Sequence, residues 1–127
     1  MSTDMNKKSY TVGADNLLRG AAHPLDMRTL VIKNPKCEIN RGALIKADAD
    51  GNYFVAGDVN AESQALSGDA MSILGHSVAE DKSSETLTVA VYVSGGFNKH
   101  AITGIKDYVL TEADILSAQK YGLYIHS

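Results

Sequence analysis

Four histidines and one cysteine are the side chains of this sequence with the most versatile chemistry. Histidine and cysteine ligands of a metal site usually occur in closely spaced pairs. The histidines here are separated by 53, 24 and 26 residues, and Cys37 has no second cysteine to pair with. Because none of the short metal-binding spacings is present, we expect no metal site. The histidines are His23, His76, His100 and His126.

An acidic turn at residues 48–52, Asp-Ala-Asp-Gly-Asn, suggests calcium binding at first sight. An EF-hand loop starting at Asp48 needs glycine at its sixth position and glutamate at its twelfth. Those positions hold Tyr53 and Val59. Asp-Gly between two apolar runs is instead typical of a β-hairpin turn, and we predict a hairpin here.

Nucleophilic catalysis is the other chemistry that these residue types suggest. Cys37 follows Lys36, which favours the thiolate, but no neighbouring residue supplies the base and oxyanion donors that such catalysis needs. Residues 94–96, Ser-Gly-Gly, lack the pattern of a nucleophile elbow and the spacing of a phosphate-binding loop. We therefore expect no catalytic residue, no cofactor and a protein that is not an enzyme.

Length and charge narrow the class of protein further. The 127 residues suit one domain that is large enough to bury a core. There are 12 basic and 15 acidic residues, and the stretch between Lys46 and Lys82 carries seven acidic residues and no lysine or arginine. Because nucleic-acid binding needs clustered basic side chains, we expect no nucleic-acid partner.

Cysteine content and hydropathy indicate the cellular compartment in which the protein folds and whether it has a membrane-spanning segment. A single cysteine cannot form an internal disulfide, which is typical of a reducing compartment. No apolar run approaches the ~18 residues that span a bilayer. The polar N-terminus also lacks the apolar stretch of a Sec-type signal peptide. We expect no membrane partner.

Residues 1–27 differ from the rest of the chain. Their charges cancel, and short apolar pieces at 10–12 and 17–18 are embedded in polar sequence, with Pro24 near the end. We predict an N-terminal arm over residues 1–27 that is disordered when free, followed by a β domain over residues 28–127. An ordinary first strand is the alternative.

From Met27 onward the pattern is mainly that of β-strands. A long polar segment at 57–69 reads as a surface loop, and the glycines at 95 and 96 predict a break after the clearest strand. The predicted strands have β-branched content or alternating polarity, and they are 29–32, 43–45, 53–55, 72–78 and 85–93.

One helix is expected near the C-terminus. Thr111 is a good N-cap, and Asp114 stands at the third helical position as in a capping box. Gly122 then ends the helix, and residues 123–125 form a short strand. The predicted fold class is mainly β (β-rich α+β): a small compact β domain with one short C-terminal helix and a flexible N-terminal arm.

The order of these pieces resembles the head decoration proteins of tailed bacteriophages, of the type of the lambda head-stabilising protein. The resemblance covers roughly residues 28–127 and lies in the order of the pieces. They are 39–45 (INRGALI), the Asp-Gly turn at 50–51, 73–75 (ILG), 78–81 (VAED), 87–93 (LTVAVYV), 94–98 (SGGFN), 101–102 (AI) and the late helix with 122–125 (GLYI).

The resemblance implies a virion protein that is made in the host cytoplasm and binds the exterior of the expanded capsid. Such proteins trimerise at local three-fold positions and clamp neighbouring subunits of the major capsid protein. It also implies that the arm contacts the capsid. Residues 10–12 would add to a free sheet edge, and the leucines would fill apolar pockets between subunits. The expected arm contacts are Tyr10, Thr11, Val12, Leu17, Leu18 and Arg19.

Two other functions stay open from the sequence. A carbohydrate- or receptor-binding module of a virion or cell surface would need an exposed aromatic cluster. A small enzyme would have to depend on Cys37. The tyrosines that could form the cluster are Tyr53, Tyr92, Tyr121 and Tyr124, although tyrosines in strands are commonly half-buried.

Overall fold

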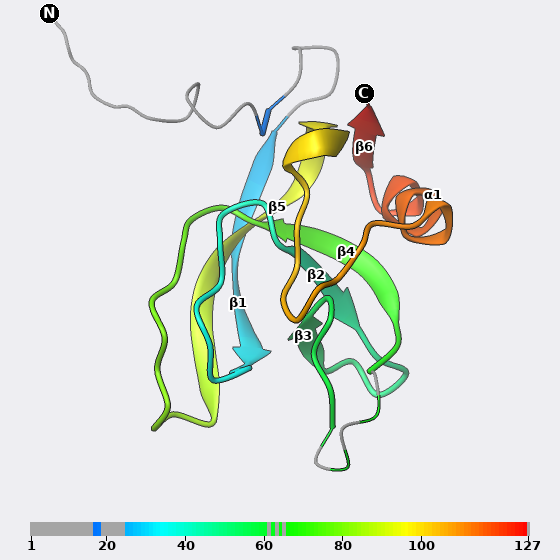
Figure 1. The fold of residues 1–127 in the computed structure, drawn as a ribbon. Helices are drawn as coiled ribbons and strands as arrows, with labels where there is room; N and C mark the ends of the chain where they lie inside the picture. The colour runs from blue at the N-terminus through cyan, green and yellow to red at the C-terminus, as the bar shows by residue number, and fades with distance from the viewer. Residues whose placement is uncertain (1–16, 19–24, 61, 63, 65, 127) are drawn as a thin grey trace, which may run out of the picture.

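Six strands and one helix make up the fold, which we describe from a computed structural model (Figure 1). The structure describes residues 17–18, 25–60, 62, 64 and 66–126. The protein is mainly β with one short helix near its C-terminus, which confirms the predicted fold class. The elements are β1 (Asp26–Lys33), β2 (Leu44–Ala47), β3 (Tyr53–Val55), β4 (Asp69–Leu74), β5 (Thr86–Asn98), a 3-10 turn η2 (Lys99–Ala101), α1 (Glu112–Lys120) and β6 (Leu123–His126).

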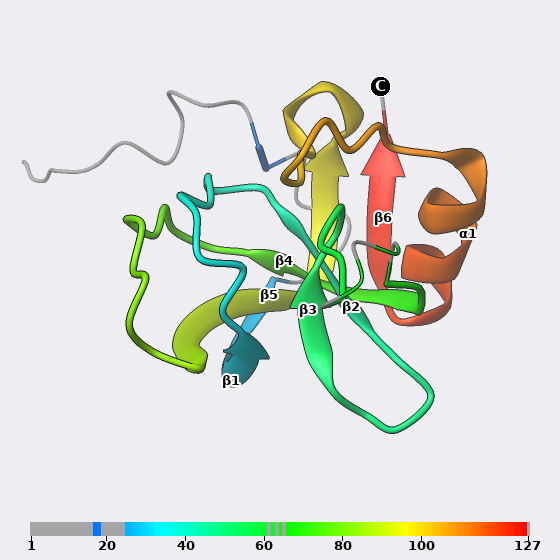
Figure 2. The same ribbon diagram turned by 60° about the horizontal axis from the view of Figure 1, so that its bottom comes forward.

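Five of the strands close into a barrel. Their order is β1-β3-β2-β4-β5, and β1 also pairs with β5 to complete the ring. All of these pairings are antiparallel except that of β1 with β3. The last strand, β6, runs parallel to the second half of β5, and α1 lies outside it (Figure 2).

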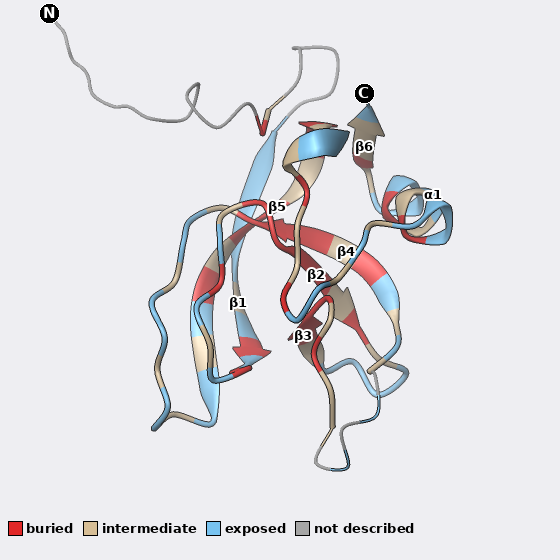
Figure 3. Cartoon of the chain, viewed as in Figure 1, coloured by how far each residue is buried: buried red, intermediate tan, exposed pale blue. Residues whose placement is uncertain are grey.

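The core has two layers because alternate strand residues face opposite sides of the sheet. Ile45 and Leu74 belong to a cluster inside the barrel, whereas their neighbours Leu44 and Ile73 belong to a second cluster outside it. The outer cluster also contains Ala118 of α1 and Leu123 of β6, so these two elements cover that side of the sheet. Figure 3 shows that burial is concentrated in β2, β3, β4 and the middle of β5, whereas β1 is mostly exposed.

The structure confirms the predicted hairpin turn at 48–52 and the predicted start and end of the helix. The Asp48 carboxylate accepts hydrogen bonds from the N–H groups of Asp50 and Asn52, and these bonds lower the pKa of Asp48. The Thr111 hydroxyl accepts a hydrogen bond from the N–H of Asp114 at 3.1 Å, as an N-cap should. Gly122 has a φ of +90° directly after the helix.

Two strand predictions need correction. Strand β4 begins at Asp69 and ends at Leu74, earlier than the predicted 72–78, and Val78 instead forms an isolated bridge with Ile39. Strand β5 continues to Asn98 rather than breaking at the two glycines. Gly95, with a φ of +138°, bends the strand there, and the parallel pairing with β6 holds the strand together across the bend.

The folded domain also begins before residue 28. Asp26 and Met27 already belong to β1 and pair with β5. Leu17 is 1% exposed within the outer core cluster. Strand β1 thus starts two residues before the expected start of the β domain, and the isolated apolar pair at 17–18 gives no local signal of its contact with β5.

Candidate docking site

The structure divides the expected arm residues into two groups. Tyr10, Thr11, Val12 and Arg19 lie outside the described residues. Leu17 and Leu18 lie against the end of β5: the carbonyl of Leu17 accepts a hydrogen bond from the N–H of Asn98 at 2.7 Å, and Leu18 bridges to Phe97.

The role expected of Leu17 changes accordingly. We expected it to fill a pocket between capsid subunits, but its side chain fills the core of its own domain. Burial of a leucine side chain stabilises a fold by roughly 1.5–3 kcal/mol. Leu17 is therefore a point where the chain before β1 is fixed to the barrel.

Strand β1 has one open edge. All eight of its residues are in register with β5, but it meets β3 through a single pair, Ile32 with Tyr53. In the part of the chain that the structure describes, no strand lies along the other edge of residues 26–31. The side chains of Met27 and Val31 are 46% and 56% exposed. A strand edge of this kind can accept an extended peptide.

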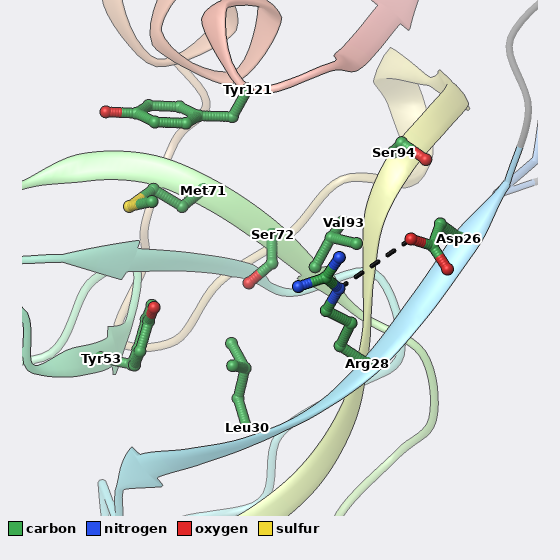
Figure 4. A pocket seen from close by; sticks show the side chains of 9 residues that line it. All are labelled: Asp26, Arg28, Leu30, Tyr53, Met71, Ser72, Val93, Ser94 and Tyr121. Atoms are coloured by element: carbon green, nitrogen blue, oxygen red, sulfur yellow. Dashed lines mark ion pairs between the residues drawn. The ribbon is translucent and has the colours of Figure 1, made fainter.

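A half-open pocket of about 360 Å³ lies beside this edge, at the mouth of the barrel (Figure 4). We call it the barrel-mouth pocket. The pocket exists because the β1 residues before Ile32 are not paired with β3. The inner faces of β4 and β5 are therefore left uncovered there. Its walls come from β1, β3, β4, β5 and the residue after α1. The lining residues are Asp26, Arg28, Leu30, Tyr53, Met71, Ser72, Val93, Ser94 and Tyr121.

Polar groups in the pocket are incompletely paired. The Ser72 hydroxyl is buried and has no hydrogen-bond partner among the described residues. Arg28 is exposed, and its Nε lies 3.9 Å from an Asp26 oxygen, which makes a loose ion pair. The Tyr121 hydroxyl, in contrast, donates to Asp69 at 3.0 Å, and this bond raises the pKa of Tyr121. A buried hydroxyl without a partner costs free energy.

Asp58 is a buried carboxylate that fixes the loops on the other side of the barrel. It accepts hydrogen bonds from Lys33 Nζ at 2.8 Å, from Lys106 Nζ at 3.3 Å and from the N–H of Val59 at 2.8 Å. These contacts tie the start of the 57–69 segment to β1 and to the loop after η2. Sequence reasoning assigned this residue to an exposed loop, because nothing local marks a carboxylate whose partners are distant in sequence.

Asp114 fixes the helix in the same way. Its carboxylate pairs with Lys46 Nζ at 3.0 Å and accepts a hydrogen bond from the Tyr108 hydroxyl. Burial, together with this hydrogen bond, raises the pKa of Tyr108. The ion pair is itself largely shielded, with side-chain exposures of 14% for Lys46 and 12% for Asp114. The buried carboxylates Asp58 and Asp114 are both paired with lysines, an arrangement that suits a rigid scaffold.

Groups suited to catalysis or metal binding are not gathered at any of these places. Burial, opposed by Lys106, raises the pKa of the Cys37 thiol and so disfavours the reactive thiolate. Among the described residues, no three His, Cys, Asp or Glu side chains are close enough to hold a metal ion. No helix in the described part of the chain is long and apolar enough to cross a membrane.

The four tyrosines considered for sugar binding are dispersed. Tyr92 is buried, with its hydroxyl bonded to Arg41 at 3.1 Å, and Tyr124 lies on β6. Tyr53 and Tyr121 do share the barrel-mouth pocket. The chain thus offers an open strand edge, a partly polar pocket and rigid loops. Comparison of the chain with protein-family models and with curated proteins finds no match.

Proposed function

We propose that this protein is a structural virion protein that decorates the head of a tailed bacteriophage. It binds the exterior of the expanded capsid as a homotrimer at three-fold positions, contacts the major capsid protein and stabilises the shell against the pressure of the packaged DNA. The observation that carries the proposal is the ordered set of segments over residues 28–127 that resembles such proteins. Most of those segments fall in β2, the hairpin turn, β4, β5, α1 and β6, whereas 39–43 and 78–81 lie in loops and 101–102 lies at η2.

The positions of Leu17 and of the C-terminal strand support a clamp. Asn98, the last residue of β5, donates its N–H to the Leu17 carbonyl and pairs with His126 of β6. Residues 17–18 and β6 therefore lie at the same end of the barrel, as Figure 1 shows. That end of the molecule could then face the shell.

The energetics of a clamp need no reactive group. A ligand that binds only the assembled, expanded lattice stabilises it by mass action, by ~4 kcal/mol per site at a thousandfold excess over Kd. Three arms on one trimer raise the effective concentration for one another, so contacts that are weak singly hold firmly together. A closed trimer also matches a three-fold position on the shell.

The remaining parts of the proposal follow from this role. The protein acts without cofactor or catalysis, is made in the host cytoplasm and functions on the outside of the virion. Neither nucleic acid nor membrane is its partner. Arm residues before Leu17, including Tyr10, Thr11 and Val12, contact the capsid.

A second candidate function rests on the barrel-mouth pocket. Tyr53 and Tyr121 lie on its walls together with the exposed Arg28, a combination of aromatic and polar groups that suits a sugar ring. A carbohydrate- or receptor-binding module would use this pocket. Binding of the purified protein to a glycan array, with loss of binding in Tyr53→Ala, would favour this function over the first.

Cryo-electron microscopy of decorated shells tests the proposed function. Expanded capsids incubated with the protein are expected to carry extra density of three subunits at each three-fold position. Unexpanded shells incubated in parallel serve as the control and should remain bare. Density at other positions, or as single subunits, would contradict the trimeric clamp.

A further inference from the structure

A second and larger hollow lies at the end of β1, where that strand meets the β2–β3 hairpin. Its volume is about 710 Å³, and its walls come from β1, the hairpin, the 57–69 segment and the start of β5. We call it the hairpin groove. Its accessible apolar surface comes from Val31, which is 56% exposed, and from the partly exposed Tyr53 and Leu66. Sites that bind ligands are commonly apolar hollows of roughly 300–1,000 Å³ with a few polar groups at the wall.

The open edge of β1 leads to this groove. Val31 is the last residue of the open edge at 26–31, and it is also a wall of the groove. The next residue, Ile32, pairs with Tyr53, so the end of β1 and the start of β3 lie side by side (Figure 1). An extended peptide that pairs with an open strand edge gains affinity from main-chain hydrogen bonds and specificity from nearby pockets. Edge and groove together have the form of such a site.

The charged residues that line the groove leave it acidic. They are Lys33, Asp48 and Glu85. Lys33 already has an internal partner, because its Nζ lies 2.8 Å from the buried carboxylate of Asp58, which Lys106 also contacts at 3.3 Å. The hairpin N–H groups that bond to Asp48 lower its pKa, so this side chain stays ionised. Glu85 is exposed, and no ion pair among the described residues involves Glu85 or Asp48.

Further carboxylates stand beside the groove. Asp50 is exposed in the hairpin turn, and Glu62 is exposed in the 57–69 segment. No lysine or arginine occurs between Lys46 and Lys82 to offset them. The two lysines at Asp58 and that carboxylate together carry one positive charge against four carboxylates, which leaves a net charge of −3 around the groove. A partner with lysine or arginine is therefore favoured, and one with carboxylates is repelled.

We propose that the hairpin groove and the open edge of β1 bind an extended segment of a partner protein that carries apolar and basic side chains. The segment pairs with residues 26–31 as an added strand. Apolar side chains pack against Val31, Tyr53 and Leu66, and a lysine or arginine two positions away contacts Glu85. A spacing of two places these side chains on the same side of an extended chain. The inference goes beyond the proposed function and does not depend on it.

Titration of the full chain with two synthetic peptides tests the site. The first is the end-capped peptide Thr-Val-Thr-Lys-Thr-Val-Thr, and the second has glutamate in place of the lysine. In NMR spectra the lysine peptide should shift the amide signals of β1 and of residues 48–54, and it should slow hydrogen exchange along 26–31. The glutamate peptide should bind at least tenfold more weakly. Equal binding of the two peptides, or shifts confined to other surfaces, would overturn the inference.

A charge exchange identifies the group that selects the basic side chain. Because Glu85 is exposed, Glu85→Lys should leave the melting temperature unchanged, weaken binding of the lysine peptide at least tenfold and strengthen binding of the glutamate peptide. Glu38→Lys is the matched control: Glu38 is also exposed but does not line the groove, so the preference for lysine should persist. Val31→Ser should weaken binding of the lysine peptide by removing an apolar wall. An unchanged preference in Glu85→Lys would refute the proposed chemistry of the partner.

Two further observations separate this inference from other occupants and from the proposed function. If the same signals shift with protein concentration when no peptide is present, the occupant is a second copy of the chain and the inference is wrong. Binding to shells is measured separately. A chain that binds the lysine peptide but no shells would contradict the proposed function alone, whereas a chain that binds shells and neither peptide would contradict this inference alone.

Discussion

Deleting residues 2–14 is expected to leave the domain folded and to weaken binding to expanded shells by roughly 10²-fold or more. The deletion removes Tyr10, Thr11 and Val12 but keeps Leu17, which belongs to the core. In the proposed trimer three arms act together, and the loss of all three would remove the gain of about 10²–10⁴ that multivalent attachment provides. The measurement is a binding isotherm on purified expanded capsids, with the melting temperature as the check on folding.

A longer deletion provides the control. Removing residues 2–25 also removes Leu17 and should lower the free energy of unfolding by about 2–5 kcal/mol, the range for loss of a buried leucine side chain. The two deletions therefore separate an arm effect from a folding effect. Full-strength binding by the shorter deletion would eliminate the arm from the mechanism.

Asp114→Ala is expected to lower the free energy of unfolding by about 3–5 kcal/mol, the range for removing one partner of a buried ion pair. The substitution leaves the ammonium of Lys46 shielded from water with no carboxylate beside it. It also removes the acceptor of the Tyr108 hydroxyl, which is half-buried. Chemical denaturation followed by circular dichroism measures the change.

Asp107→Asn is the matched control for this substitution, because asparagine tolerates the φ of +65° at this residue. Asp107 is an exposed aspartate in the same loop region, with no ion pair among the described residues. Its replacement should change the free energy of unfolding by no more than about 0.5 kcal/mol, as is usual for surface positions. If Asp114→Ala were equally mild, the ion pair with Lys46 would have no role in holding α1 to the sheet.

The sequence was informative where structure is determined locally. The Asp-Gly turn, the Thr111 cap and the alternation of 87–93 each depend on neighbours within a few residues, and each predicted its element correctly. Barrel closure could not be predicted in this way. It depends on the pairing of β1 with β5, whose partners are distant in the chain, and on a bend at Gly95 that looks like a strand end in the sequence.

The candidate docking site was less accessible to sequence reasoning. The barrel-mouth pocket arises because β1 leaves β3 after one pair, which no local pattern encodes. Ser72 and Val109 are ordinary residues in the sequence, and only the fold buries one and exposes the other. The buried state of Asp58 likewise depends on two lysines that are far from it in sequence.

A barrel with residues 17–18 and the C-terminal strand both at one end of β5 is consistent with a protein that stabilises a surface already built by others. The buried carboxylates Asp58 and Asp114 hold loops and the helix in place. In the proposed function, the residues before Leu17 attach the protein to the shell.

Co-sedimentation with phage shells tests the central claim most directly. Purified full-length protein is mixed with expanded capsids and, in parallel, with unexpanded procapsids of the same phage, and each mixture is pelleted through a cushion. The account predicts saturable binding to the expanded shells, with three copies at each three-fold position. It predicts no binding to the procapsids. Equal recovery with both shells, or none with either across phages that infect the same host, would contradict it.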